Sequence, residues 1–446
     1  MRIDNESSAS DSAQRCPVTG LGREFNPFVD PYLADPYAFW LRARQTEPVF
    51  YSPELDYWVV TRYADIKAIF ADPSTFSASI AQTPIRPLAA EVVQMLQSGG
   101  FRTKAVMSNA DPPEHTRVRK FTWQAFTPKR VAQLEPEVRR LVTRSLDRIE
   151  GRRRADLVKD IFYELPVLVL FLFLGMPEED VARVKTWSRN RLMLTWGRLS
   201  DEQQLTEAKG LLEYWKYTEA FIQGLLAEPP DNYVGDLIRV SQRNENDLSI
   251  HEITNVVYGL LIAGHETTTS MSANAIVTLM QHRDAWDRLC ADGALISNAV
   301  EELLRFDSSV ITWRRKAVKA VELAGVSIPQ GANLLLALCS GNRDDAHFPQ
   351  PDTLDLDREN AKTHLSFGFG IHYCLGAPLA RLELKVILEE MTRRLPSLRL
   401  VPGQTWAYPP NTSFRGPAQL WAEWSVQQGT GATGRASTTA TQGPAG

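Results

Sequence analysis

A cysteine placed to bind a metal lies in a glycine-rich loop near the carboxyl end of the chain. The segment FGFGIHYCLG, residues 367–376, leads directly into an amphipathic pattern that begins at Ala377. Glycine permits backbone angles closed to other residues, so this loop can turn tightly and aim its N–H groups at the sulfur of Cys374. We expect the helix dipole to lower the pKa of Cys374 and make it a better metal ligand.

A second unusual segment, AGHETT at residues 263–268, lies within a predicted helix. A glycine, an acid and two threonines are poor choices there for helix stability alone. The Thr267 hydroxyl can bond back to the carbonyl of Ala263 and bend the helix, while Gly264 removes side-chain bulk, which predicts a groove. A mildly kinked structural helix with a solvent-facing Glu266 is the alternative from this segment alone.

Charged side chains with helical spacing are weaker indicators. Glu302 and Arg305 lie one turn apart on one predicted face, and His115 and Arg119 share a face in the same way. On a surface an ion pair contributes little, so Glu302 and Arg305 are consistent with a solvated pair. His115 and Arg119 are each consistent with a surface base. Cys374 alone could also be a small core residue or a catalytic thiol. A hydrolase that pairs it with His372 is disfavoured, since two residues apart on a tight loop is a poor arrangement for base and nucleophile.

The elements that position these residues are mainly helical, with a minor β region. Apolar residues at i, i+3, i+4 spacing predict helices over 138–149, 179–194, 201–226, 249–281, 298–306 and 377–395. Strand-like stretches occur at 49–61, 317–328 and 334–338. The fold class expected is mainly α.

Composition excludes several classes of protein. The chain has 446 residues, of which 43% are hydrophobic and 23% charged, as in a globular protein. The net charge of -4 comes without long runs of either sign, so no nucleic-acid partner is expected. Four scattered cysteines fit a reducing cytoplasm. The apolar run 165–176 is shorter than the roughly 20 residues that cross a bilayer, so we expect no membrane partner.

The two ends of the chain differ in composition from the middle. Residues 1–24 are polar and predict a flexible lead, with ordered structure beginning near Phe25. Residues 425–446 form a Gly, Ala, Thr and Gln tract that predicts a disordered, linker-like tail. We expect one merged domain over residues 25–424.

With its FxxGxHxCxG spacing, the cysteine loop resembles the haem-binding loop of the cytochrome P-450 family. Family-like segments follow in the expected order over residues 25–424. The resemblance implies the cytochrome P-450 fold and a haem b whose iron is bound by the thiolate of Cys374, with Phe367, Gly368 and Gly376 in the binding loop. It also implies a buried pairing of Glu302 with Arg305 and a second arginine, for which Arg358 is the candidate.

The same resemblance assigns roles to the other motifs. Residues 263–268 match the family's oxygen-binding helix, where Ala263 and Gly264 border the haem, Thr267 hydrogen-bonds bound O2 and Glu266 connects it to solvent protons. The haem propionates are expected to pair with His115, Arg119, Arg315 and His372, with Arg314 as the alternative to Arg315.

Residues 47–63 and 410–417 look like a narrower bacterial group, in which the haem domain is fused to a flavin and iron-sulfur reductase related to phthalate dioxygenase reductase. This implies electrons from NAD(P)H through such a redox partner. The chain carries no reductase, so a stand-alone protein and a severed haem domain both stay open. By position, the loop 77–107, Leu260, Leu261, Ala263, residues 310–312 and Phe414 are expected to line the substrate pocket.

The resemblance therefore implies a monooxygenase that inserts one atom of O2 into a small, largely apolar organic substrate, by hydroxylation, epoxidation, dealkylation or heteroatom oxidation. A peroxygenase or peroxidase on the same fold would use hydrogen peroxide and has less need of Glu266 and Thr267. A haem sensor or carrier would have no evident use for them. Substrate-dependent oxygen consumption distinguishes the last alternative from the first.

Overall fold

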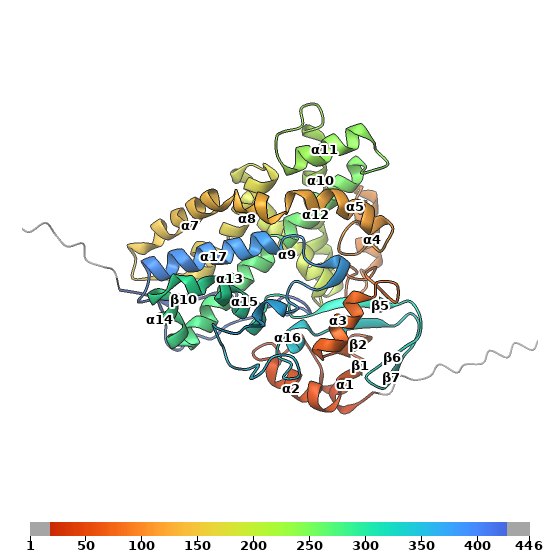
Figure 1. Ribbon diagram of the computed structural model, residues 1–446. Coiled ribbons are helices and arrows are strands. Elements are labelled where there is room, and N and C mark those ends of the chain that lie inside the picture. The colour runs from red at the N-terminus through yellow and green to blue at the C-terminus, as the bar shows by residue number, and fades with distance from the viewer. Residues whose placement is uncertain (1–17, 426–446) are drawn as a thin grey trace, which may run out of the picture.

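The fold is built mainly from helices, as expected from the apolar stripes. The computed structural model describes residues 18–425. Figure 1 shows the long helices at one side, together with β10, and the strands β1, β2, β5, β6 and β7 at the other, beside α1, α2 and α3. The helices are α1 Gly20–Glu24, α2 Tyr37–Thr46, α3 Tyr63–Ala71, α4 Ala90–Ser98, α5 Glu114–Thr122, α6 Pro128–Ala132, α7 Glu135–Glu150, α8 Leu165–Leu174, α9 Val181–Trp196, α10 Asp201–Gly224, α11 Tyr233–Arg243, α12 Ile250–Ala263, α13 Glu266–Gln281, α14 Arg283–Ala291, α15 Ile296–Phe306, α16 Leu338–Gly341 and α17 Ala377–Arg394.

Small sheets form the minor β region. The strands are β1 Val49–Ser52, β2 Tyr57–Val60, β3 Phe76–Ser77, β4 Arg154–Asp156, β5 Trp313–Ala317, β6 Val321–Leu323, β7 Val326–Ile328, β8 Asn333–Leu336, β9 Arg399–Leu400 and β10 Trp421–Glu423. The five-stranded sheet has the order β1-β2-β8-β5-β3, and β2 and β8 run parallel with Val59 opposite Leu335. The sheet thereby joins the amino-terminal strands to the chain just before the cysteine loop.

The largest core cluster lies among the helices. It includes most of α8, a helix apolar on all sides and buried along nearly its whole length. The carboxyl-terminal helix α17 runs beside α7 and packs against α13 and α15 (Figure 1). Within residues 18–425 no helix is long and apolar enough to cross a membrane. The loop that precedes α17 is thus anchored to the most deeply buried part of the molecule.

The structure differs from two sequence predictions about helix boundaries. The helix predicted over 249–281 is interrupted at Gly264 and His265, which separates α12 from α13. Order was expected to begin near Phe25, but α1 begins at Gly20 because Thr19 caps it and Leu21 packs into the aromatic cluster around Phe25. Residues 1–17 of the predicted lead and 426–446 of the predicted tail lie outside the described residues.

Candidate active site

The cysteine loop has the tight backbone that its glycines predicted. Gly368 and Gly370 adopt φ of 70° and 71°, in the left-handed region that favours glycine. A Cβ on Gly370 would lie 2.5 Å from the carbonyl oxygen of Phe70, so no side chain fits there. The loop closes with a hydrogen bond of 2.9 Å from the N–H of Cys374 to the carbonyl of Phe367. These contacts place Cys374 directly before α17.

Backbone donors reach the cysteine as predicted. The N–H groups of Gly376 and Ala377 hydrogen-bond Cys374, and the guanidinium groups of Arg119 and Arg381 add positive charge nearby. The prediction of a lowered pKa is nevertheless wrong, because burial raises the pKa of the Cys374 thiol by more than these groups lower it. The donors and cations offset part of that rise, and a coordinated metal ion would deprotonate the thiol outright.

Four basic side chains predicted from three separate segments meet beside this loop. The rings of His115 and His372 lie 4.2 Å apart between their centroids. Both imidazole nitrogens of His115 and Nε2 of His372 are buried without a hydrogen-bond partner among the described residues. Arg119 donates 2.6 Å to the carbonyl of Tyr373, and Arg315 is buried at 2% exposure. The pocket therefore holds unused donors and excess positive charge.

The electrostatics of this basic pocket fit an anionic group. Burial, followed by Arg119, lowers the pKa of His115 to about 4. Burial, followed by Arg315, lowers the pKa of His372 to about 3. Two carboxylates would accept hydrogen bonds from the unpartnered nitrogens and relieve the repulsion between the bases. This donor set suits the propionates of a haem.

The arginine that precedes Arg315 does something else. Arg314 and Arg315 point to opposite faces because they are neighbours on strand β5. The guanidinium of Arg314 donates to the backbone carbonyls of Ala81 and Thr83, at 2.9 and 2.5 Å. Arg314 thus anchors the loop 77–107, whereas Arg315 lies near His115 and His372.

The predicted bend in the long helix is present. Thr267 Oγ1 donates to the carbonyl of Ala263 at 2.7 Å, at the point where α12 ends and α13 begins. Ala263 is exposed at this break, as a residue that lines a groove would be. Gly264 lies against α8 instead, since a Cβ at this position would lie 3.1 Å from Leu170 of α8. The missing side chain at position 264 therefore lets α8 approach.

Glu266 is neither solvent-facing nor free. Its Oε1 lies 3.3 Å from Lys185 Nζ and 3.2 Å from His265 Nε2. Burial raises the pKa of Glu266, but Lys185 and His265 lower it further, to about 2. The side chain of Lys185 has no exposed surface, and its ammonium lies 4.2 Å from the ring centroid of Tyr163. Glu266 is consequently an ionised carboxylate held in a buried ion pair.

Sequence reasoning missed Lys185 and His265, although one indication of Lys185 was present. In α9 it lies among the buried positions Val181, Val184 and Ser188, which form the core-facing stripe. A lysine within an apolar stripe is rarely buried unless it is paired. That position therefore pointed to an acid somewhere across the helix interface.

The pairing expected around Glu302 is confirmed. Arg305 donates from Nε and one terminal nitrogen to the two Glu302 oxygens, both at 2.7 Å, and Arg358 Nε lies 3.0 Å from Oε2. The side chains of Glu302 and Arg305 have no exposed surface. Both arginines also donate to backbone carbonyls before the cysteine loop, among them Thr353. The network therefore braces the chain that leads into the loop.

The nominated pocket residues divide into two groups. Phe414 pairs with Val310 in an isolated β-bridge and packs with Trp196 and Ile262, while Leu260 is only partly buried. Leu261 and Ile311 are instead enclosed in core clusters, and their place in the pocket stays a prediction. Sequence position could not distinguish these faces because apolar residues flank the site on both sides.

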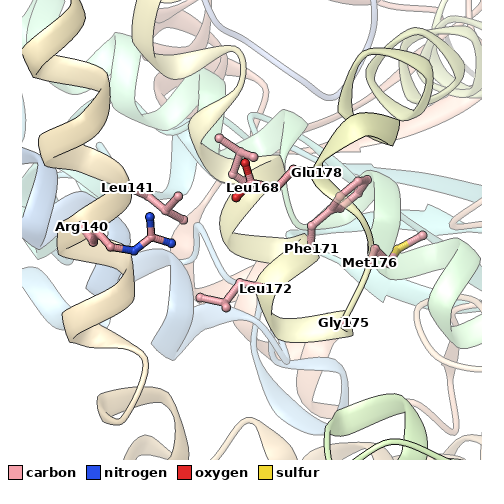
Figure 2. A pocket seen from close by; sticks show the side chains of 8 residues that line it. All are labelled: Arg140, Leu141, Leu168, Phe171, Leu172, Gly175, Met176 and Glu178. Atoms are coloured by element: carbon pink, nitrogen blue, oxygen red, sulfur yellow. The ribbon is translucent and has the colours of Figure 1, made fainter.

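A cavity of about 230 Å³ lies elsewhere, on the outside between α7 and α8. Figure 2 shows Leu141 of α7 facing Leu168 and Leu172 of α8 around it. None of its lining residues belongs to the site described above. This cavity offers no group suited to the chemistry of the cysteine loop.

The helical fold with small sheets and a glycine-rich cysteine loop before its last long helix defines the class of haem-thiolate oxidoreductases. The family model described as Cytochrome P450 matches residues 216–405. Cytochrome P450-SU2 of Streptomyces griseolus is 37% identical over 87% of this chain and 94% of its own length. The chain therefore belongs to the cytochrome P450 family of haem-containing oxidoreductases.

Solved structures agree with this assignment. An intact type IV self-sufficient cytochrome P450 monooxygenase superimposes with a TM-score of 0.89 at 41% identity, over 92% of this chain and 54% of that one. Cytochrome P450 CREJ in complex with (4-ethylphenyl) dihydrogen phosphate superimposes with a TM-score of 0.87 at 39% identity, over 91% and 100%. The chain thus spans about half the length of the self-sufficient enzyme.

Proposed function

We propose that this protein is a monooxygenase that inserts one atom of O2 into a small, largely apolar organic substrate. The observation that carries the proposal is the convergence of Cys374 and the basic pocket on one loop. Backbone N–H groups hydrogen-bond Cys374 and two guanidinium groups lie near it, while His115 and His372 present unpartnered nitrogens nearby. A cysteine thiolate is one of the ligands that hold haem iron, and the basic side chains suit the two propionates of a haem b.

The cysteine loop and the residues around it then have distinct roles in holding the cofactor. When bound, the haem supplies oxygen activation at its iron. Cys374 would bind the iron, with Phe367, Gly368 and Gly376 shaping the loop around the sulfur. His115, Arg119, Arg315 and His372 would pair with the propionates. Ala263, which is exposed at the break between α12 and α13, would border the haem, and Gly264 would let α8 pack against this helix.

Thr267 and Glu266 would handle protons beside the break between α12 and α13. The Thr267 hydroxyl donates to Ala263 in this structure, which directs its oxygen as an acceptor for a proton on an incoming ligand or water. Glu266 would pass protons from solvent toward Thr267 Oγ1. Because Lys185 holds Glu266 ionised, proton uptake by Glu266 must work against this ion pair.

The substrate would be recognised by desolvation and shape. Phe414, Trp196 and Ile262 form an apolar cluster with Leu192, next to the segment that ends α12. Aromatic and aliphatic walls of this kind favour an apolar molecule over a strongly charged one. Hydroxylation, epoxidation, dealkylation and heteroatom oxidation are all compatible with such a pocket.

Electrons would come from NAD(P)H through a reductase that carries a flavin and an iron-sulfur centre. The likeness to an intact self-sufficient enzyme, whose chain is nearly twice as long, supports this source. Phe369 and Ile371 of the cysteine loop are each 38% exposed, so the loop presents an accessible face to a redox partner.

The test compares two sources of oxidising equivalents. Product should form with NADPH, a reductase of this type and O2, and much less should form with hydrogen peroxide alone. Product with peroxide alone, at equal or higher rates, would assign the protein as a peroxygenase. Cys374→Ala should abolish the red-shifted Soret band of the reduced, carbon monoxide-bound protein, and Thr267→Ala should uncouple oxygen consumption from product. Unchanged coupling would contradict the role of the hydroxyl.

A further inference from the structure

A charged cluster that no motif predicted lies beside the cysteine loop. Glu301 of α15 accepts two hydrogen bonds from Arg381 of α17, from Nε at 2.6 Å and from a terminal nitrogen at 2.9 Å. His364 Nε2 lies 3.2 Å from the second Glu301 oxygen. Because His364 Nδ1 accepts the N–H of Ser366 at 3.1 Å, its proton is on Nε2 and the neutral ring donates to Glu301.

The charge state of Glu301 follows from these partners. Burial raises the pKa of Glu301, but the bonds from His364 and Arg381 lower it further, to about 2. Glu301 is therefore ionised, and its negative charge compensates the positive charge of Arg381. Arg381 is mostly buried, at 27% side-chain exposure, so water screens this charge only partly.

Arg381 in turn contacts both ends of the cysteine loop. One terminal nitrogen donates 2.9 Å to the hydroxyl of Tyr373, the residue before Cys374. The guanidinium also lies 4.6 Å from the ring centroid of Phe367, whose carbonyl accepts the Cys374 N–H. Its positive charge therefore lies against the two loop residues that hold Cys374 in place. Arg381 thus hydrogen-bonds one end of the loop and places its positive charge against the aromatic ring at the other end.

We propose that Glu301 is a positioning residue for the Cys374 thiolate, because it holds the Arg381 guanidinium in place and neutralises its charge beside the sulfur. This inference depends on Cys374 as the iron ligand. Without the Glu301 carboxylate, the charge of Arg381 would remain uncompensated near the thiolate. A positive charge there would stabilise the reduced cofactor site, which carries one more negative charge than the oxidised site. The midpoint potential would then shift to more positive values.

A matched control is available on α17, the helix that carries Arg381. Glu390 of α17 is 8% exposed and also pairs with two arginines, Arg139 at 2.9 Å and Arg393 at 2.5 Å. Neither arginine contacts the cysteine loop in any described interaction. Glu390→Gln therefore removes a buried, arginine-paired carboxylate from α17 without a change beside Cys374.

The experiment measures the midpoint potential of the haem-loaded protein by spectroelectrochemical titration. Glu301→Gln should shift the potential to more positive values, Glu301→Asp should restore most of the wild-type value because it retains the charge, and Glu390→Gln should leave it unchanged. Equal potentials for Glu301→Gln and Glu390→Gln would overturn the inference. A shift of the same size in Glu301→Asp would also overturn the electrostatic part.

A second measurement covers the case in which Glu301→Gln does not fold. Tyr373→Phe removes only the hydroxyl that Arg381 holds. In mild denaturant Tyr373→Phe should lose the thiolate-type Soret band of the reduced carbon monoxide complex several-fold faster than Glu390→Gln. Equal rates would overturn the claim that Arg381 holds the loop in place. If Cys374→Ala kept the wild-type band, the ligand assignment itself would fail. If Cys374→Ala loses the band but Glu301→Gln and Glu390→Gln have equal midpoint potentials, the ligand assignment stands and only the present inference is refuted.

Discussion

The buried ion pair of Lys185 and Glu266 allows a quantitative test of the site's electrostatics. The lowering of the Glu266 pKa from 4.5 to about 2 corresponds to roughly 3 kcal/mol, at about 1.4 kcal/mol per pH unit. The net worth of the pair is smaller, because burial lowers the pKa of Lys185 despite its partner. We expect Lys185→Met to destabilise the fold by about 2–4 kcal/mol, since it leaves a buried carboxylate without its cation.

A double-mutant cycle separates this pair from its surroundings. Lys185→Met and Glu266→Gln should each destabilise the protein, whereas the double variant should lose about 2 kcal/mol less than the sum, because neither charge is then left alone. Urea unfolding of the haem-loaded protein, followed by far-ultraviolet circular dichroism near neutral pH, gives the free energies. The exposed pair Lys216 and Glu213, 3.5 Å apart with side-chain exposures of 51% and 60%, is the control and should couple weakly.

The pH dependence supplies an independent check. In the wild type the Glu266 contribution is complete above the unfolded pKa and is lost only as the pH falls toward about 2. In Lys185→Met, burial should raise the Glu266 pKa above its unfolded value, so the deficit should grow as the pH rises from about 4.5. Additive single effects, or a coupling no larger than that of Lys216 and Glu213, would refute the reasoning.

Further outcomes follow from other buried groups. Burial alone raises the pKa of Glu383 well above its usual value, so wild-type stability should fall as the pH rises above about 4.5, and Glu383→Gln should remove this slope in urea unfolding; equal slopes would contradict it. Arg305→Met should cost about 3–5 kcal/mol because it leaves Glu302 buried with one fewer cation, as thermal or urea unfolding would report. Gly264→Ala should destabilise by about 1–3 kcal/mol through its 3.1 Å contact with Leu170, and Leu170→Ala should relieve part of that loss; no relief would place the strain elsewhere.

Local patterns predicted those features that depend on neighbours in sequence. The bend between α12 and α13 follows from a threonine four residues after Ala263, and the hydrogen bond that causes it was found where the spacing placed it. The glycines at 368 and 370 are in left-handed conformations that only a tight loop requires. The long amphipathic helices were predicted for the same reason, since a stripe of apolar residues needs no knowledge of its partner.

Features that depend on distant partners were missed. The ion pair of Glu266 was missed because Lys185 belongs to another helix. Glu301 was overlooked beside Glu302 because Arg381 and His364 follow much later in the chain. The lowered pKa expected for Cys374 was wrong for a related reason. Local donors were visible in the sequence, whereas the extent of burial is a property of the whole fold.

Buried ion pairs lie near Cys374 and next to Thr267, the two residues on which the proposed chemistry depends. Glu301 and Glu302 lie next to each other on α15, yet one reaches Arg381 beside the sulfur and the other reaches Arg358 at the entry to the loop. Replacing such pairs by apolar residues is often neutral for stability, so stability alone does not account for them. A carboxylate that binds a guanidinium through two bonds fixes an angle as well as a distance. The pairs are therefore best understood as constraints on where the Cys374 sulfur lies, a property that an apolar core of equal stability would leave free.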